Sequence, residues 1–131
     1  RAEALMIGGD ILDRMRANPL QNYAGLGFNA APALPRDCVA RGCNAAQMSG
    51  YDIALWRCSI NDLNAALNRY PACIALGVTG TLPGGQGAIV NNAASALCAV
   101  QPGETCVIVR WIDDPSQRTY TSVTLRTRTT N

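Results

Sequence analysis

The chain has 131 residues, of which 48% are apolar and 15% are charged, a composition typical of one folded domain rather than a disordered segment. It contains no His and no Lys, which excludes Ser–His–Asp and Cys–His catalysis, most catalytic zinc sites, phosphate-binding P-loops and Schiff-base chemistry. The net charge of +2 is too small to indicate nucleic-acid binding. We therefore expect no catalytic activity, no cofactor, no metal and no small-molecule substrate.

Residues 1–18 are predicted to form a helix, because apolar residues recur at helical spacing from Ala4 to Met15 and Pro19 ends the pattern. Residues 4–9 are apolar on all sides, whereas residues 10–16 are amphipathic. No capping residue precedes the first turn. We expect the end of a longer helix, in a protein roughly thirty residues longer. The alternative is a short surface helix with a frayed first turn.

A second helix is predicted over residues 45–68, after a Pro- and Gly-rich loop at residues 19–44. Large apolar residues step along it by three and four positions, which we interpret as core packing rather than as a coiled coil. Asn44 and Gln47 resemble a capping box at its start, and an alternative start lies at Ser49. The apolar stripe consists of Ile53, Trp56, Ile60, Leu63 and Leu67.

Strands are predicted in the second half of the chain. A turn-rich connection contains a short strand at Ile74–Thr79, and a second strand follows at residues 88–91. The clearest strands are residues 105–112 and residues 119–127, which are rich in β-branched and aromatic residues and form a hairpin. The element order predicts an α+β fold, with helices packed on one face of an antiparallel sheet.

The alternation within this hairpin assigns its two faces. On the outer face, Arg110 and Arg126 are expected beside Tyr120. The inner face is expected to pack against a helix through Val107, Val109, Trp111, Val123 and Leu125.

Six cysteines form an even set in a small chain, which predicts three disulfides and an oxidising compartment. Zinc binding is the alternative, but the closest pair is separated by four residues rather than by two. Many pairings are open, and we prefer the pairing of sequence neighbours because it closes only local loops. This pairing joins Cys38 with Cys43, Cys58 with Cys73, and Cys98 with Cys106.

Three motifs with potential chemistry have simpler explanations. LPGGQG at residues 82–87 is interpreted as a turn rather than a phosphate loop, because no Lys follows it. Asp113 and Asp114 are interpreted as part of a solvated loop, because a calcium site needs more oxygen ligands. Cys98 and Cys106 flank a Pro–Gly turn, which favours a structural disulfide over a reactive pair.

Three arginines near the end of the chain, Arg110, Arg126 and Arg128, are candidates for docking an acidic partner. The alternative is that they belong to a solvated face of the sheet.

Export is expected from the predicted disulfides. The chain has no apolar run of about 20 residues that could span a bilayer, and no basic leader opens it. We therefore expect that an export signal has been removed.

Four stretches of the chain carry a family resemblance. They are ALMIGGDILDRMRANP at residues 4–19, Gln47 to Arg57, LPGGQGAIV at residues 82–90, and VIVRWIDD at residues 107–114. They resemble, in the same order, the corresponding stretches of minor pilins of the type IV pilus, of the PilV type. Residues 92–105 have no counterpart, and six cysteines are many for that family.

The resemblance implies a membrane helix that begins at a prepilin-peptidase site and continues into a spine helix. Residues 1–18 would be the C-terminal part of this spine, and residues 19–131 would form the globular head. The subunit would be anchored in the inner membrane of a Gram-negative bacterium with its head in the periplasm, and later become extracellular in the pilus. Its partners would be other minor pilins, the major pilin and a tip adhesin, near the tip where assembly is primed.

Apolar residues of the spine helix are expected to divide between the head of the same molecule and neighbouring subunits. Two alternatives remain open: a minor pseudopilin of a type II secretion system, and a free periplasmic disulfide-rich binding module. The candidate interface residues are Leu5, Ile7, Ile11, Leu12 and Met15.

Overall fold

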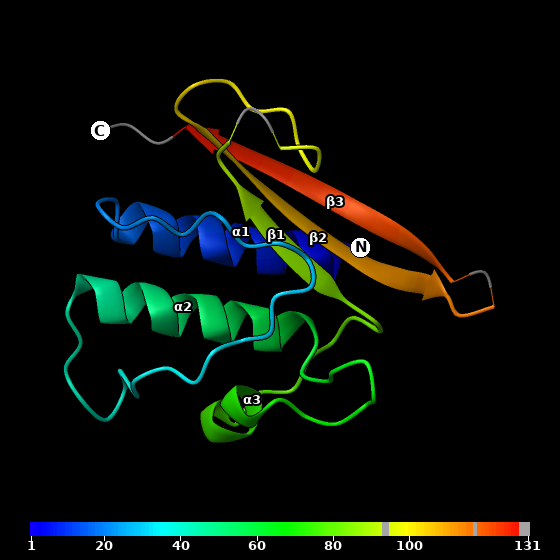
Figure 1. Cartoon of the computed structure of the whole chain (residues 1–131), viewed down its shortest axis with the longest axis horizontal. Coiled ribbons are helices and arrows are strands. Elements are labelled where there is room, and N and C mark those ends of the chain that lie inside the picture. The colour runs from blue at the N-terminus through cyan, green and yellow to red at the C-terminus, as the bar shows by residue number, and fades with distance from the viewer. Residues whose placement is uncertain (93–94, 117, 129–131) are drawn as a thin grey trace.

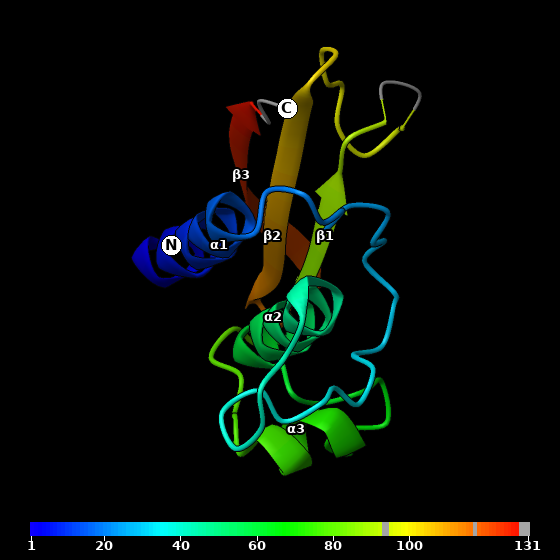
Figure 2. The same ribbon diagram turned by 90° about the vertical axis from the view of Figure 1, so that its left-hand side faces the viewer.

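Two helices of sixteen residues each, α1 (Ala2–Ala17) and α2 (Ala45–Ile60), lie side by side against one face of a sheet (Figure 1). The computed structural model describes residues 1–92, 95–116 and 118–128. Within them, a short helix α3 (Pro71–Leu76) lies on the side of α2 away from the sheet (Figure 2).

The sheet is antiparallel and has the strand order β1–β2–β3. The strands are β1 (Gln86–Val90), β2 (Glu104–Asp114) and β3 (Thr119–Arg128). The predicted α+β class, with helices on one face of an antiparallel sheet, is confirmed. The two predicted hairpin strands are each slightly longer than expected, and the predicted strand at residues 88–91 begins two residues earlier.

The prediction of a first helix is confirmed, and its apolar stripe faces the head. Gly8 lies in the middle of this stripe, where a Cβ atom would stand 2.6 Å from Cδ1 of Leu125. The absence of a side chain at Gly8 therefore lets α1 lie close to β3. The buried residues of the helix are Ala4, Gly8, Ile11, Leu12 and Met15.

The predicted start of α2 is confirmed, because both halves of the capping box are present. The backbone N–H of Gln47 donates to Oδ1 of Asn44 at 2.8 Å, and the N–H of Asn44 donates to Oε1 of Gln47 at 3.0 Å. The alternative start at Ser49 is wrong, since the helix already runs from Ala45.

The predicted end of this helix at residue 68 is wrong, because α2 ends at Ile60. The carboxylate of the next acid, Asp62, accepts hydrogen bonds from the backbone of Gly80 and from Nε of Arg69, each at 2.8 Å. These bonds hold the chain in a turn where the apolar periodicity predicted helix. Leu67, expected on the apolar stripe, has a φ of 65° and is 75% exposed.

The strand predicted at Ile74–Thr79 is wrong, because most of that segment lies in or just after the helix α3. Pro71 occupies the first turn of this helix, where its missing N–H is not needed. Gly77 ends the helix in the left-handed conformation, with a φ of 68°.

The predicted packing of the hairpin is confirmed on its inner face. Val107, Val109, Trp111 and Val123 join the main core beneath the helices, and Leu125 packs against that core. β2 also buries residues on the opposite face, where a second, smaller core is formed. It consists of Val90, Cys98, Val100, Cys106 and Ile108, with Phe28 at its side.

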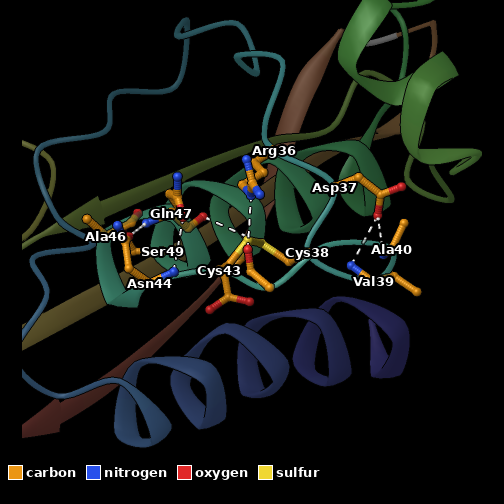
Figure 3. The surroundings of a disulfide bond; sticks show 12 residues. Arg36, Asp37, Cys38, Val39, Ala40, Cys43, Asn44, Ala46, Gln47 and Ser49 are labelled. Carbon is orange, nitrogen blue, oxygen red and sulfur yellow. Dashed lines mark hydrogen bonds between the residues drawn. A yellow bond between two sulfur atoms is a disulfide. The ribbon is translucent and has the colours of Figure 1, made fainter.

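All three disulfides join sequence neighbours, so the preferred pairing is the one present. The bond between Cys58 and Cys73 is fully buried and attaches α3 to α2. The Cys38–Cys43 bond closes a small ring beside the first turns of α2 (Figure 3). Oδ1 of Asp37 orders this ring by accepting the N–H groups of the two residues after Cys38.

The two disulfides at α2 should differ in their contribution to stability. Replacing Cys58 and Cys73 together by Ala should cost about 3 kcal/mol, because a loop of fifteen residues is released and a buried contact is lost. The same change at Cys38 and Cys43 should cost about 2 kcal/mol or less, because that loop spans five residues at the surface. Urea denaturation of both double variants measures the difference, and an equal or reversed order would contradict this account.

Candidate functional site

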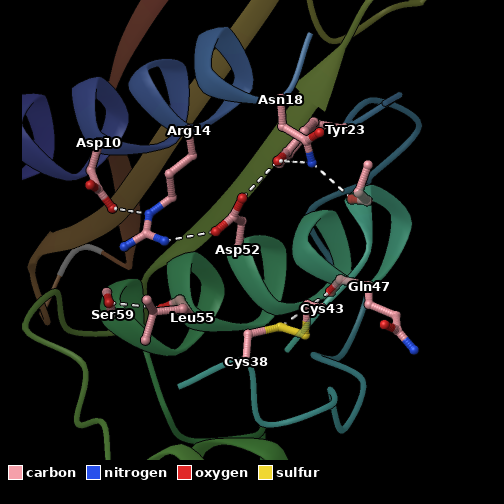
Figure 4. A network of polar contacts seen from close by, with 11 residues as sticks. Asp10, Arg14, Asn18, Tyr23, Cys38, Cys43, Gln47, Asp52, Leu55 and Ser59 are labelled. Carbon is pink, nitrogen blue, oxygen red and sulfur yellow. Dashed lines mark hydrogen bonds and ion pairs between the residues drawn. A yellow bond between two sulfur atoms is a disulfide. The ribbon is translucent and has the colours of Figure 1, made fainter. Parts of the chain in front are cut away.

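A buried carboxylate joins the first helix to the second (Figure 4). Asp52 on α2 accepts a hydrogen bond from Nη1 of Arg14 on α1 through its Oδ1, at 2.7 Å. Oδ2 of Asp52 accepts a hydrogen bond from the hydroxyl of Tyr23, also at 2.7 Å. Asn18 donates both to the oxygen of Tyr23 and to the carbonyl of Ala45 at the start of α2. We call Arg14, Asn18, Tyr23 and Asp52 the Asp52 network. It fixes the end of α1 against α2 and the loop between them.

The ionisation of the Asp52 network follows from its burial. Burial alone would lower the pKa of the Arg14 guanidinium, but hydrogen bonds to Asp52 and Asp10 outweigh it, so the pKa is raised. Burial, together with the hydrogen bond to Asp52, raises the pKa of Tyr23 to about 12. At neutral pH the network therefore contains an arginine cation and a neutral phenol.

A second contact joins the stretches that carry the family resemblance. Nε1 of Trp56 donates to the carbonyl of Ile7 at 3.2 Å, so α2 also holds the first half of α1. A Cβ atom at Gly87 would stand 2.5 Å from the ring of Trp56, so only glycine lets β1 pass this close. Gly87 belongs to the LPGGQG stretch, whose first four residues form the predicted turn and whose last two residues already belong to β1.

Arg57 is buried beside this contact, and no carboxylate of the described residues forms an ion pair with it. Its guanidinium donates to the backbone carbonyls of Gly27 and Gly87. Its Nε has no hydrogen-bond partner in the part of the chain that the structure describes. Burial lowers the pKa of Arg57, and the group remains a cation at neutral pH. This residue ties α2 to both the long loop and β1.

The side of α1 that points away from the head changes character along the helix. Its first half presents Met6, which is 75% exposed, and Leu5, which is 44% exposed, together with the small residues Ala2 and Gly9. A Cβ atom at Gly9 would have no atom of the described residues within 4 Å beyond its own stretch of helix. We call these four residues the α1 outer patch. The second half of the same side is charged, with the exposed residues Asp10, Asp13 and Arg16.

The five predicted interface residues are divided by the structure. Ile11, Leu12 and Met15 are buried in the core of their own chain, whereas Leu5 is exposed. Ile7 is half-buried and packs against the core. Met6 is more exposed than any of the five, and its position on the helix opposite Ala4, Gly8 and Ile11 could have identified it as exposed.

The three predicted docking arginines do not form one cluster. Arg110 stacks between the rings of Phe28 and Tyr120, so the prediction that it lies beside Tyr120 is confirmed. The same prediction for Arg126 is wrong. Arg126 lies near the other end of β3 from Tyr120, where it pairs with Cys106 of β2. Its Nη1 donates to Oε1 of Glu104 at 2.9 Å. Arg128 is exposed at the end of β3.

The other sequence motifs are placed as follows. The prediction that Asp113 and Asp114 lie in a loop is wrong, because both belong to the end of β2, where they are exposed. Oδ1 of Asp114 accepts hydrogen bonds from the backbone N–H and the hydroxyl of Ser116. Cys98 and Cys106 are joined to each other within the second core. Among the described residues, no group of three or more His, Cys, Asp or Glu side chains could hold a metal ion.

Comparison of the chain with family models, with curated proteins and with solved structures finds no match. Within the described residues, each helix is too short or too polar to cross a bilayer.

Removing the arginine of the Asp52 network should destabilise the protein strongly. Arg14→Ala leaves the carboxylate of Asp52 buried without its cation, which should cost about 3 kcal/mol. Arg16→Ala is a matched control on the same helix, because its pairing with Asp13 is exposed and should contribute less than about 0.5 kcal/mol. Chemical denaturation measures the free energy of unfolding of both variants. Similar losses would show that the Asp52 network stabilises the protein no more than an exposed ion pair does.

The phenol of Tyr23 should make stability fall at alkaline pH. Its pKa is about 12 in the folded protein and 10.0 ordinarily, so its contribution is complete below pH 10 and is lost as the pH rises toward 12. The free energy of unfolding should fall more steeply over that interval in the natural protein than in Tyr23→Phe. If the free energy of unfolding fell equally steeply with pH in both proteins, the phenol of Tyr23 would not be the cause of the alkaline loss of stability.

Proposed function

We propose that this chain is a minor pilin of the type IV pilus, of the PilV type, comprising the end of the spine helix and the head. In this proposal it is incorporated at or near the pilus tip with other minor pilins and the major pilin. It primes assembly there and supports a tip adhesin. Its task is packing and docking, without catalysis.

The residues that carry the family resemblance support the proposal by their mutual contacts. Arg14 from the first stretch pairs with Asp52 from the second, and Trp56 from the second lies against Gly87 from the third. The fourth stretch supplies the core of the sheet through Val107, Val109 and Trp111. Together these stretches fix how the first helix lies on the head. A filament subunit needs this position to be fixed, because its helix and its head contact different neighbours.

The single observation that carries the proposal is the α1 outer patch. Isolated exposed apolar residues are common on protein surfaces. Here Met6 and Leu5 lie together with Ala2 and Gly9 on the one side of α1 that the head does not cover. Small residues beside large apolar ones allow a second helix to approach closely. In pilins of this kind, spine helices pack against each other inside the filament, and such a patch suits that packing.

The cellular location in this proposal is the inner membrane, with the head in the periplasm, followed by the extracellular pilus. The three disulfides support it, because disulfides persist in the periplasm and outside the cell. A membrane helix, as in other pilins of this type, would precede α1 and anchor the subunit before assembly.

Charging the α1 outer patch should block assembly without unfolding the head. Met6→Asp, introduced into the full-length gene in its own bacterium, should strongly reduce surface pili, because a carboxylate would be buried between packed helices. Ala17→Asp is the matched control, since it adds the same charge at an exposed position in the last turn of α1. Electron microscopy and sheared-pilus yields measure piliation, and denaturation of the purified variants of residues 1–131 checks folding.

Normal piliation in Met6→Asp, in a strain that loses its pili when the gene is deleted, would contradict packing through this patch. Normal piliation after deletion itself would contradict the pilin assignment. Loss of type II secretion with intact pili would instead indicate a minor pseudopilin.

A further inference from the structure

A groove of about 680 Å³ opens beside the end of α2. It is lined by the segment that follows α2, including Leu63 and Leu67, and by residues 80–87. Phe28, Gln86, Ile112 and Tyr120 line its end over the sheet. Its volume lies in the range of ligand-binding sites in proteins.

Three of the residues at that end hold Arg110. The guanidinium lies 3.7 Å from the ring centre of Phe28 and 4.0 Å from that of Tyr120. Its Nε and Nη2 donate to Oε1 of Gln86 at 2.9 and 2.6 Å, and Gln86 in turn donates to Oδ1 of Asn29. We call Phe28, Gln86, Arg110 and Tyr120 the Arg110 cage. Two rings, and one amide oxygen that accepts two N–H groups of the guanidinium, hold the cation in one orientation.

The charge of this cage is not neutralised within the described part of the chain. The acceptor of Arg110 is a neutral amide, and no carboxylate lies within ion-pair distance of it there. Arg57 lines the groove itself, whereas Arg110 lies behind Phe28, Gln86 and Tyr120; the partners of Arg57 among the described residues are backbone carbonyls. Asp62 is the one acid among the described lining residues, and Arg69 already neutralises it. The groove and its cage therefore carry an excess of positive charge.

We propose that the groove and the Arg110 cage bind an extended acidic segment of a partner protein. One carboxylate would accept N–H groups from the free side of the guanidinium, at Nη1 and Nη2, where arginine can form two parallel bonds. Aliphatic side chains beside that carboxylate would cover Leu67, which is 75% exposed on the wall, and Ile112. The combination of an apolar wall with a rigid cation favours a peptide over a free anion.

This site is separate from the surface used in the proposed function. Arg110 alternates along β2 with Val109 and Trp111, which face α1 and the main core. The cage thus lies on the face of the sheet away from the helices. Packing through the α1 outer patch would leave it open to a different partner, and the inference does not depend on the pilin assignment.

A peptide titration tests the proposal on the chain of residues 1–131. The probe is N-acetyl-Leu-Asp-Leu-amide, added to ¹⁵N-labelled protein and followed by NMR. We expect saturable shifts of the Nε–H of Arg110, the side-chain amide of Gln86 and the backbone N–H of Gly85. The Asn-containing counterpart of the peptide should bind about tenfold or more weakly, because the charged acceptor is lost.

Arg110→Gln should weaken binding of the acidic peptide by a similar factor, and Arg110→Lys should weaken it too, because the planar fork is lost. Arg128→Gln removes one charge from the same sheet outside the cage and should bind as the natural protein does. Should Arg110→Gln fail to fold, the lysine variant and the Asn-containing peptide still decide the question. The proposal is overturned by absent shifts, by equal binding of the two peptides, or by tighter binding of glucuronate, an acidic sugar.

Discussion

The position of the first helix depends on one buried carboxylate, Asp52. A carboxylate that leaves water must be compensated by charge and hydrogen bonds. Arg14 supplies the charge from α1, and Tyr23 supplies a hydroxyl from the loop between the helices. The end of α1 and the loop that follows it are therefore both bound to one carboxylate of α2, about thirty to forty residues further along the chain. If α1 shifted along α2, this carboxylate would be buried without its partners, so the helix has one favoured register.

That fixed register determines which residues α1 presents to the outside. With Arg14 bound to Asp52, and the carbonyl of Ile7 bound to Trp56, the stripe of small and apolar residues must face the sheet. The opposite side is then exposed, and its first half is the apolar patch around Met6. The proposed packing of spine helices thus follows from a polar contact inside the head. The Arg110 cage, on the other face of the sheet, offers a second and chemically different surface.

The sequence predicted those parts of the fold that local patterns determine. The capping box at Asn44 and the alternation of β2 and β3 are encoded within a few residues. The end of α2 was missed because Asp62 is held by Gly80, eighteen residues away, which no periodicity reveals. The exposed side of α1 is only partly predictable, because hydrophobicity alone does not distinguish the exposed Met6 from the buried Leu12 of the same helix. The hydrogen bond between Tyr23 and Asp52, and the stacking of Arg110 between Phe28 and Tyr120, depend on tertiary contacts that local sequence patterns do not reveal.

The most direct test is a double-mutant cycle between the first two helices. Free energies of unfolding are measured for the natural protein, Arg14→Ala, Asp52→Asn and the combination. Asparagine at position 52 retains an oxygen that can accept the hydroxyl of Tyr23, so the cycle isolates the ion pair. If this pair fixes α1, the losses should be non-additive, with a coupling energy above about 1 kcal/mol. Additivity within about 0.3 kcal/mol would contradict the account, because the two side chains would then stabilise the protein independently.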